Sequence, residues 1–299
     1  MSLLNALLAY LVGSRIWRSP AVRVLTALLM LVAPASLYYS YAAPRSLLPI
    51  AFILAWLWCV AAAEAGREDW PLLAGAFLLG IGCYSYTTAI VLMPVYLVMT
   101  VALSMYERRP NWLPAALVVL FMLPASFGIW WVATHRAVYA EHIQRYRIYD
   151  ASRLNPLQGL KDFANYNNVQ ERVSIYWDYF DPRYLFFTGG AEMSLARPAG
   201  VLPAACALWI PIGLYKLFKR RAALDVVLIA GFFTAPLAAI LVDEPYIARR
   251  DLAVIPFAVL IALFGSEHLL SSGSRFWRLA TIGLFVSAGI QGLLVVVQR

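Results

Sequence analysis

The sequence contains few charged residues. Only 13% of its 299 residues are Asp, Glu, Lys or Arg, whereas 62% are hydrophobic and the mean hydropathy is +0.71. This balance excludes an ordinary soluble globular domain. A formal net charge of +8 would suggest a nucleic-acid partner in a soluble protein. In a chain this apolar, Lys and Arg instead mark cytoplasmic loops, so we expect a lipid bilayer and no nucleic acid as its surroundings.

Common catalytic and metal-binding patterns are also missing. The sequence has no Gly-rich phosphate loop and no Gly-x-Ser-x-Gly element. Its three histidines, at positions 135, 142 and 268, do not cluster. Cys59, Cys83 and Cys206 each lie inside an apolar run, without metal-ligand spacing or an obvious disulfide partner. We therefore expect no metal and no cofactor, and buried cysteines that act as small apolar side chains.

Apolar runs recur along the whole chain. A bilayer core of about 30 Å needs about 20 apolar residues per helix, and helices satisfy their own backbone hydrogen bonds. The pattern predicts an all-α, polytopic transmembrane helix bundle of about ten spans in one domain. The predicted spans are 1–17, 22–39, 49–63, 72–84, 89–105, 113–133, 201–217, 226–242, 252–265 and 277–297. Six spans thus fall in 1–133 and four in 201–299, on either side of a large loop at 134–200.

The distribution of basic residues predicts the orientation. Short loops on one side of the predicted bundle carry twelve Lys or Arg: Arg15, Arg18, Arg23, Arg67, Arg108, Arg109, Lys216, Lys219, Arg220, Arg221, Arg275 and Arg278. Short loops on the other side carry three: Arg45, Arg249 and Arg250. Because Lys and Arg are retained in the cytoplasm, the large loop is expected outside, on the periplasmic face of a bacterial inner membrane.

The end of the large loop, residues 174–203, is rich in polar, aromatic and turn-forming residues. Asp181-Pro182 and Gly189-Gly190 are turn signals, and the run at 184–187 suits a membrane–water boundary. This stretch is either a loop that re-enters the bilayer or one wall of a substrate site. Asp178, Asp181 and Arg183 are its candidate site residues, although an Asp before Pro often only forms a turn.

A second charged stretch, residues 243–251, lies between two predicted spans on the same side as the large loop. It contains the acids Asp243 and Glu244, then Tyr246, Arg249 and Arg250. The planar guanidinium of Arg suits phosphate oxygens, but charges are also common where helix ends meet water. Arg45 and Tyr86 face the same compartment and either line a cavity or anchor the interface.

The end of the large loop, residues 174–203, resembles a known family. The order Asp-Pro-Arg-Tyr-Leu-Phe-Phe, Gly-Gly and Arg-Pro-x-Gly-Val-Leu-Pro looks like the end of the large periplasmic loop in GT-C polytopic glycosyltransferases similar to protein O-mannosyltransferases (family 39). The resemblance implies transfer of a sugar from a polyprenyl phosphate to an acceptor hydroxyl, with inversion. A carboxylate would take the proton and cations would stabilise the departing phosphate. It also implies that Tyr246, Arg249 and Arg250 contact that phosphate.

The family places its key acidic pair in a first external loop that this sequence does not contain. The next expected external segment, 40–48, holds no acid, and the first apolar run reaches Arg15 without a basic flank before it. We therefore expect the true start to lie upstream, or a partner chain to supply the missing part, with no transfer by residues 1–299 alone. If these residues do transfer sugar, the base would be Asp178, Asp181, Asp243 or Glu244.

Two other classes fit the same sequence. A transporter or flippase for a lipid-linked substrate is one, and a non-catalytic membrane subunit is the other. Transporters usually place charges near the middle of the bilayer and contain paired repeats. Here the charges lie at span ends, and only the break at 84–88 suggests a broken helix. The sugar and the acceptor are left open.

Overall fold

The computed structural model of the chain describes residues 1–135, 166–190, 193, 199–240 and 246–297. These residues form helices and connecting turns, with no strand among them. The helices that run along the bundle are α1 (Ser2–Ile16), α2 (Pro20–Val32), α4 (Leu48–Gly66), α5 (Trp70–Gly82), α6 (Ala89–Tyr106), α7 (Leu113–Thr134), α12 (Cys206–Arg220), α13 (Ala223–Thr234), α16 (Val254–Leu270) and α17 (Arg275–Val297). The prediction of an all-α bundle is confirmed.

Length and composition support a membrane protein. Five helical segments are long and apolar enough to cross a bilayer, namely Pro44–Gly66, Ala89–Tyr106, Leu113–Thr134, Ala223–Ile240 and Arg275–Val297. A sixth is obtained if the bent pair α2 and α3 (Pro34–Ala42) counts as one span, while α1, α5 and α16 are apolar but shorter. The outer helices α7 and α17 also expose large apolar side chains, among them Phe127 and Leu293. Such faces suit lipid rather than water.

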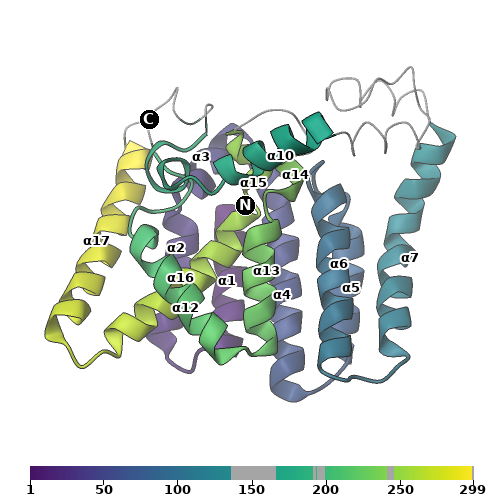
Figure 1. Cartoon of the computed structure of the whole chain (residues 1–299), viewed down its shortest axis with the longest axis horizontal. Coiled ribbons are helices and arrows are strands. Elements are labelled where there is room, and N and C mark those ends of the chain that lie inside the picture. The colour runs from purple at the N-terminus through teal and green to yellow at the C-terminus, as the bar shows by residue number, and fades with distance from the viewer. Residues whose placement is uncertain (136–165, 191–192, 194–198, 241–245, 298–299) are drawn as a thin grey trace.

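The helices alternate in direction, so the loops collect at two ends (Figure 1). The turns after α1, α4, α6, α12 and α16 lie together at the lower end of the view, which we call the basic end. Most of the basic residues counted above belong to these turns or to the helix ends beside them. The other end is covered by the roof, residues 166–190, which contains α10 (Tyr166–Asp178) and the π-helical turn η3 (Tyr184–Thr188).

The span predicted at 22–39 is not one straight helix. It breaks at Ala33, where α2 ends and α3 begins with Pro34, and the two helices differ in direction by 52°. Proline has no backbone N–H and its ring clashes with the preceding turn, so a helix interior does not tolerate it without a kink. The break at 84–88 was predicted, and there α5 and α6 are two separate helices.

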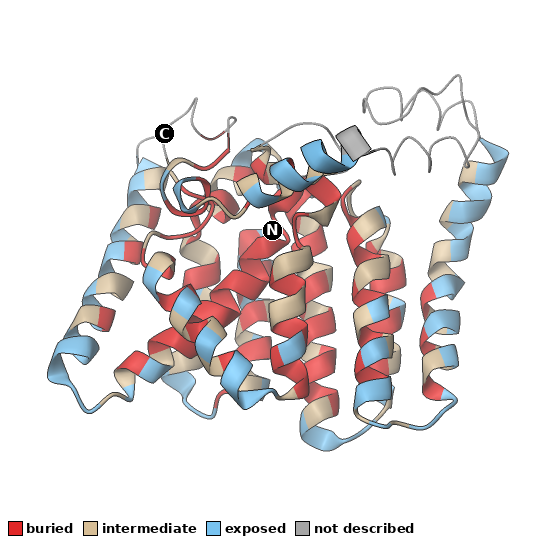
Figure 2. Ribbon diagram, viewed as in Figure 1, coloured by how far each residue is buried: buried red, intermediate tan, exposed pale blue. Residues whose placement is uncertain are grey.

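Helix α16 is the centre of one half of the bundle and is buried along most of its length (Figure 2). Every residue from Val254 to Ser266 is buried, as expected of a helix that is apolar on all sides. It packs against α2, α4, α12, α13 and α17. The closest approach is to α12, because a Cβ added to Gly213 would lie 2.0 Å from the carbonyl oxygen of Ile261, and one added to Gly265 would lie 2.0 Å from that of Trp209.

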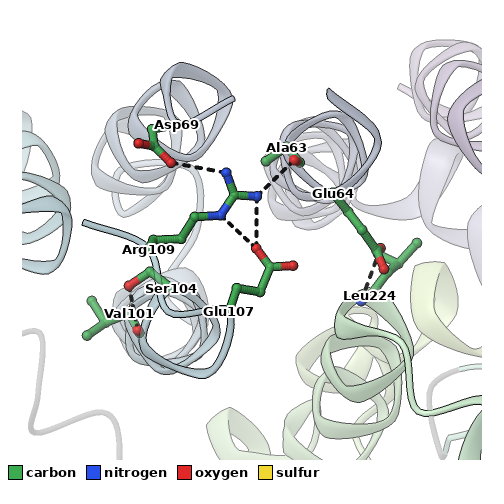
Figure 3. Close-up of polar contacts among 8 residues, drawn as sticks. All are labelled: Ala63, Glu64, Asp69, Val101, Ser104, Glu107, Arg109 and Leu224. Carbon is green, nitrogen blue, oxygen red and sulfur yellow. Dashed lines mark hydrogen bonds and ion pairs between the residues drawn. The ribbon is translucent and has the colours of Figure 1, made fainter. Parts of the chain in front are cut away.

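A polar network joins several helices at the basic end (Figure 3). The guanidinium of Arg109 donates to Asp69 Oδ1 at 3.1 Å, to Glu107 Oε2 at 2.9 Å and to the carbonyl oxygen of Ala63 at 3.0 Å. One side chain therefore connects the end of α4, the start of α5 and the end of α6. Beside it, Glu64 accepts a hydrogen bond from the backbone N–H of Leu224, at 3.3 Å, which links α4 to α13.

Candidate functional site

The roof brings the two charged stretches predicted from the sequence together. Helix α10 ends at Asp178, and the chain turns at Asp181, whose Oδ1 accepts a hydrogen bond from the backbone N–H of Arg183 at 2.8 Å. This is the turn that Asp-Pro predicts. Below the roof lies α15 (Ala248–Asp251), which belongs to the second stretch.

Two glycines let the roof lie directly on α15 and on the part of the chain that follows the roof. Gly189 has φ +63°, a conformation that residues with a side chain rarely adopt. A Cβ added to Gly190 would lie 2.3 Å from the carbonyl oxygen of Tyr246 and 2.9 Å from the backbone nitrogen of Ala248. The Gly-Gly pair is therefore a contact point as well as a turn, and any larger residue at 190 would lift the roof.

Tyr246 carries the part of the site that is open to solvent. Its backbone is left-handed, with φ 59°, which is unusual for a bulky residue. Its partial burial raises the pKa of the phenol, and the neighbouring carboxylates of Asp178 and Asp181 raise it further, while Arg183 lowers it. These effects place Asp178, Asp181 and Arg183 within electrostatic reach of Tyr246. Asp178 and Asp181 are half-buried and Arg183 is exposed.

A row of tyrosine rings leads inward from Tyr246. Its ring centroid lies 5.7 Å from that of Tyr184, which in turn lies 5.4 Å from Tyr179 at a perpendicular angle. The hydroxyl of Tyr179 accepts a hydrogen bond from the backbone N–H of Ile247 at 3.2 Å. Tyr179 and Tyr184 are almost fully buried. One ring of the aromatic run at 184–187 is therefore buried, between Tyr179 of the roof and Tyr246, which precedes α15.

Asp251 lies at the inner end of this row and has no exposed surface. Its carboxylate oxygens have no hydrogen-bond partner within the usual limits of distance and angle, and neither do the buried hydroxyls of Tyr184 and Tyr96. The Tyr184 hydroxyl is nevertheless near enough to act on the acid. Burial raises the pKa of Asp251 well above its usual range, and Tyr184 lowers it by a smaller amount.

The structure thus groups some of the predicted site residues and separates others. Asp178, Asp181, Arg183 and Tyr246 come together, whereas Asp243 and Glu244 lie outside the described residues. Arg249 is half-buried and Arg250 is only 8% exposed. Both already interact with other groups of the chain.

Arg45 and Tyr86 lie at the same end of the bundle. Arg45 is exposed on η1 (Pro44–Leu47), and Tyr86 is half-buried in the turn between α5 and α6. Neither is among the described groups that act on Tyr246 or Asp251. In the described part of the chain, no three His, Cys, Asp or Glu residues are placed to hold a metal ion. The three cysteines are free.

Asp251 lies in the second charged stretch and Tyr184 in the aromatic run, but neither they nor Tyr96 were among the site residues that the sequence indicated. Asp251 follows two arginines at the start of an apolar run, where an acid is ordinary. Only its complete burial distinguishes it.

In comparisons with known proteins, no family model matches the chain, and no curated protein matches it.

Proposed function

We propose that the chain is a membrane glycosyltransferase of GT-C type, which transfers a sugar from a polyprenyl phosphate to an acceptor hydroxyl at the roof end of the bundle. The observation that carries this proposal is the convergence of Asp178, Asp181 and Arg183 with Tyr246. Two stretches that are far apart in the sequence there place carboxylates and a cation around one half-open position. This is the pair of charges that the reaction needs.

The proposal places the whole bundle in a bacterial inner membrane. In it all ten main helices cross the bilayer, including the shorter α1, α5, α12 and α16. The basic end faces the cytoplasm, because Lys and Arg are retained there, and the roof faces the periplasm. The donor's polyprenyl tail would then lie in the outer leaflet, with its phosphate at the height of the roof.

The chemistry assigns a role to each member of the group. One carboxylate, Asp178 or Asp181, takes the proton of the acceptor hydroxyl as its oxygen bonds to the anomeric carbon. The bond from that carbon to the phosphate oxygen breaks, and the polyprenyl phosphate leaves with the electron pair. Arg183, assisted by Arg249, offers charge-assisted hydrogen bonds to that phosphate. Arg183 is the better placed of the two since it is exposed.

A transporter or flippase for a lipid-linked substrate is the second candidate. The observation in its favour is the bend of 52° between α2 and α3. Discontinuous helices form the substrate sites of many transporters. This reading predicts movement of the lipid-linked sugar between leaflets without breakage of its phosphate bond.

A binding experiment with a matched control tests the proposed site. Arg183→Ala should weaken binding of polyprenyl phosphate to the purified protein at least about tenfold, since a hydrogen bond to a charged group contributes about 1.5–3 kcal/mol. Arg275→Ala is the control, because Arg275 is equally exposed at the basic end. Equal affinity of the two variants would contradict the assignment of the phosphate to the roof.

The same preparation, in vesicles with lipid-linked sugar, separates the two candidate functions. Release of polyprenyl phosphate that Asp178→Asn or Asp181→Asn abolishes supports transfer. Movement of intact donor between leaflets supports the transporter.

A further inference from the structure

The chain contains two described aspartates with no exposed surface, and they differ in one respect. Asp225, at the start of α13, forms an ion pair with Arg220, whose Nε donates to Asp225 Oδ2 at 2.7 Å. Asp251 has no such partner: among the described residues, no Lys, Arg or His acts on its carboxylate. A buried carboxylate without a counter-ion is unstable in its charged form.

The groups around Asp251 are oxygens rather than cations. The hydroxyl of Tyr184 comes from the roof and that of Tyr96 from α6, and both are buried without a hydrogen-bond partner. The ring of Tyr96 is fixed between Trp56, at 5.0 Å, and Phe257, at 5.6 Å. Burial, and then the charge of Asp251, raise the pKa of Tyr176 on α10. The hydroxyl of Tyr176 already donates to the carbonyl oxygen of Phe233 at 2.7 Å.

Buried polar atoms without partners are rare in folded proteins and call for an explanation. Here four such oxygens, from three elements, belong to groups that act on one another: the two of the carboxylate and the two hydroxyls. Oxygen ligands select hard cations. A single negative charge balances a monovalent ion, whereas a divalent ion would leave an uncompensated positive charge in an apolar interior.

We propose that Asp251, Tyr184 and Tyr96 form an internal binding site for an alkali cation, Na⁺ or K⁺, beneath the roof. The cation neutralises Asp251 and accepts the lone pairs of the two hydroxyls. Because Tyr184 belongs to the roof and also contacts Tyr246, an occupied site holds the roof on α15. The proposal does not depend on the reaction assigned to the roof.

Thermal unfolding of the purified protein tests the proposal. At pH 8 and constant ionic strength, NaCl or KCl should raise the Tm relative to N-methyl-D-glucamine chloride, whose cation is too large for the site. The rise should saturate with concentration at roughly 3–8 °C when the cation is far above its Kd. The Na⁺ and K⁺ series show which ion fits. An equal Tm in all three salts would overturn the proposal. It would mean that Asp251 is neutralised by a proton and not by a cation.

Variants locate the effect. Asp251→Asn should abolish the cation response and unfold in N-methyl-D-glucamine chloride at a Tm no lower than that of the wild type, because its amide is neutral. Tyr184→Phe, which removes only the hydroxyl, should fold and require several-fold more cation for half of the response. Asp225→Asn is the matched control, since its acid already has Arg220, and it should keep the full response. A full response in the Asp251 or Tyr184 variant would place the cation elsewhere and overturn the assignment.

Discussion

Arg109 is the residue on which the basic end depends most. Its guanidinium makes four donor contacts to three helix ends while its side chain is only 10% exposed. Arg109→Ala would leave Asp69 and Glu107 partly buried without their shared cation. We expect the free energy of unfolding to fall by about 2–3 kcal/mol, which is less than for fully buried ion pairs because both acids reach water. Thermal unfolding in detergent micelles measures it.

The neighbouring Arg108 provides the control for this prediction. It carries the same charge in the same turn but is exposed, so Arg108→Ala should change the stability by no more than about 0.5 kcal/mol. Arg109→Lys should restore only part of the loss, because an ammonium group does not reproduce the planar fork. Equal losses at 108 and 109 would show that the turn responds to net charge and not to this network.

The residues of the candidate site were only partly predictable. The sequence indicated Asp178, Asp181, Arg183 and Tyr246 because acids, arginines and turn residues there interrupt apolar runs. Asp251 was not singled out as a site residue because only the fold buries it and brings it near Tyr184, which lies 67 positions earlier. A contact between such distant positions has no periodicity or spacing that would reveal it.

At the scale of elements, the crossing of α12 and α16 is the tightest helix contact in the described bundle. Gly213 and Gly265 allow backbone to meet backbone, as small residues do between membrane helices. Gly265→Ala places a methyl group 2.0 Å from the carbonyl oxygen of Trp209, so the helices must separate. We expect a loss of about 2–3 kcal/mol, measured by thermal unfolding.

The matched control is Gly283→Ala in α17, where an added Cβ meets nothing within 4 Å. This change should be neutral or stabilise the protein by up to about 1 kcal/mol, because Ala favours a helix more than Gly does. If the free energy of unfolding falls equally in both variants, the destabilisation at Gly265 arises from the helix backbone and not from the crossing of α12 and α16.

The elements themselves could largely be predicted. Apolar runs between charged turns predicted every main helix, and the observed ends mostly lie within a few residues of the expected ones. The break at Ala33–Pro34 was missed because the run is apolar throughout and proline often lies harmlessly in a first helical turn. The roof was predicted as an aromatic and turn-rich stretch, but its place on α15 depends on the close approach at Gly190.

At the scale of the whole molecule, the expected orientation has a direct test. A reporter that is active only outside the cytoplasm should be active when fused after Gln170, in α10, and inactive when fused after Arg221, between α12 and α13. The reason is the excess of Lys and Arg at the basic end. The reverse pattern would place the roof in the cytoplasm and remove the periplasmic site.

The central position of α16 has a consequence for how the protein is made. It is the second-to-last main helix to leave the ribosome, yet α2, α4, α12 and α13 all pack on it. Until α16 is synthesised, those earlier helices lack their shared packing partner, and the face of α12 that carries Gly213 contacts lipid or a chaperone instead. The bundle can therefore complete its packing only late in synthesis. Chains that stop before residue 254 should be degraded by membrane proteases, although most of their spans are already inserted.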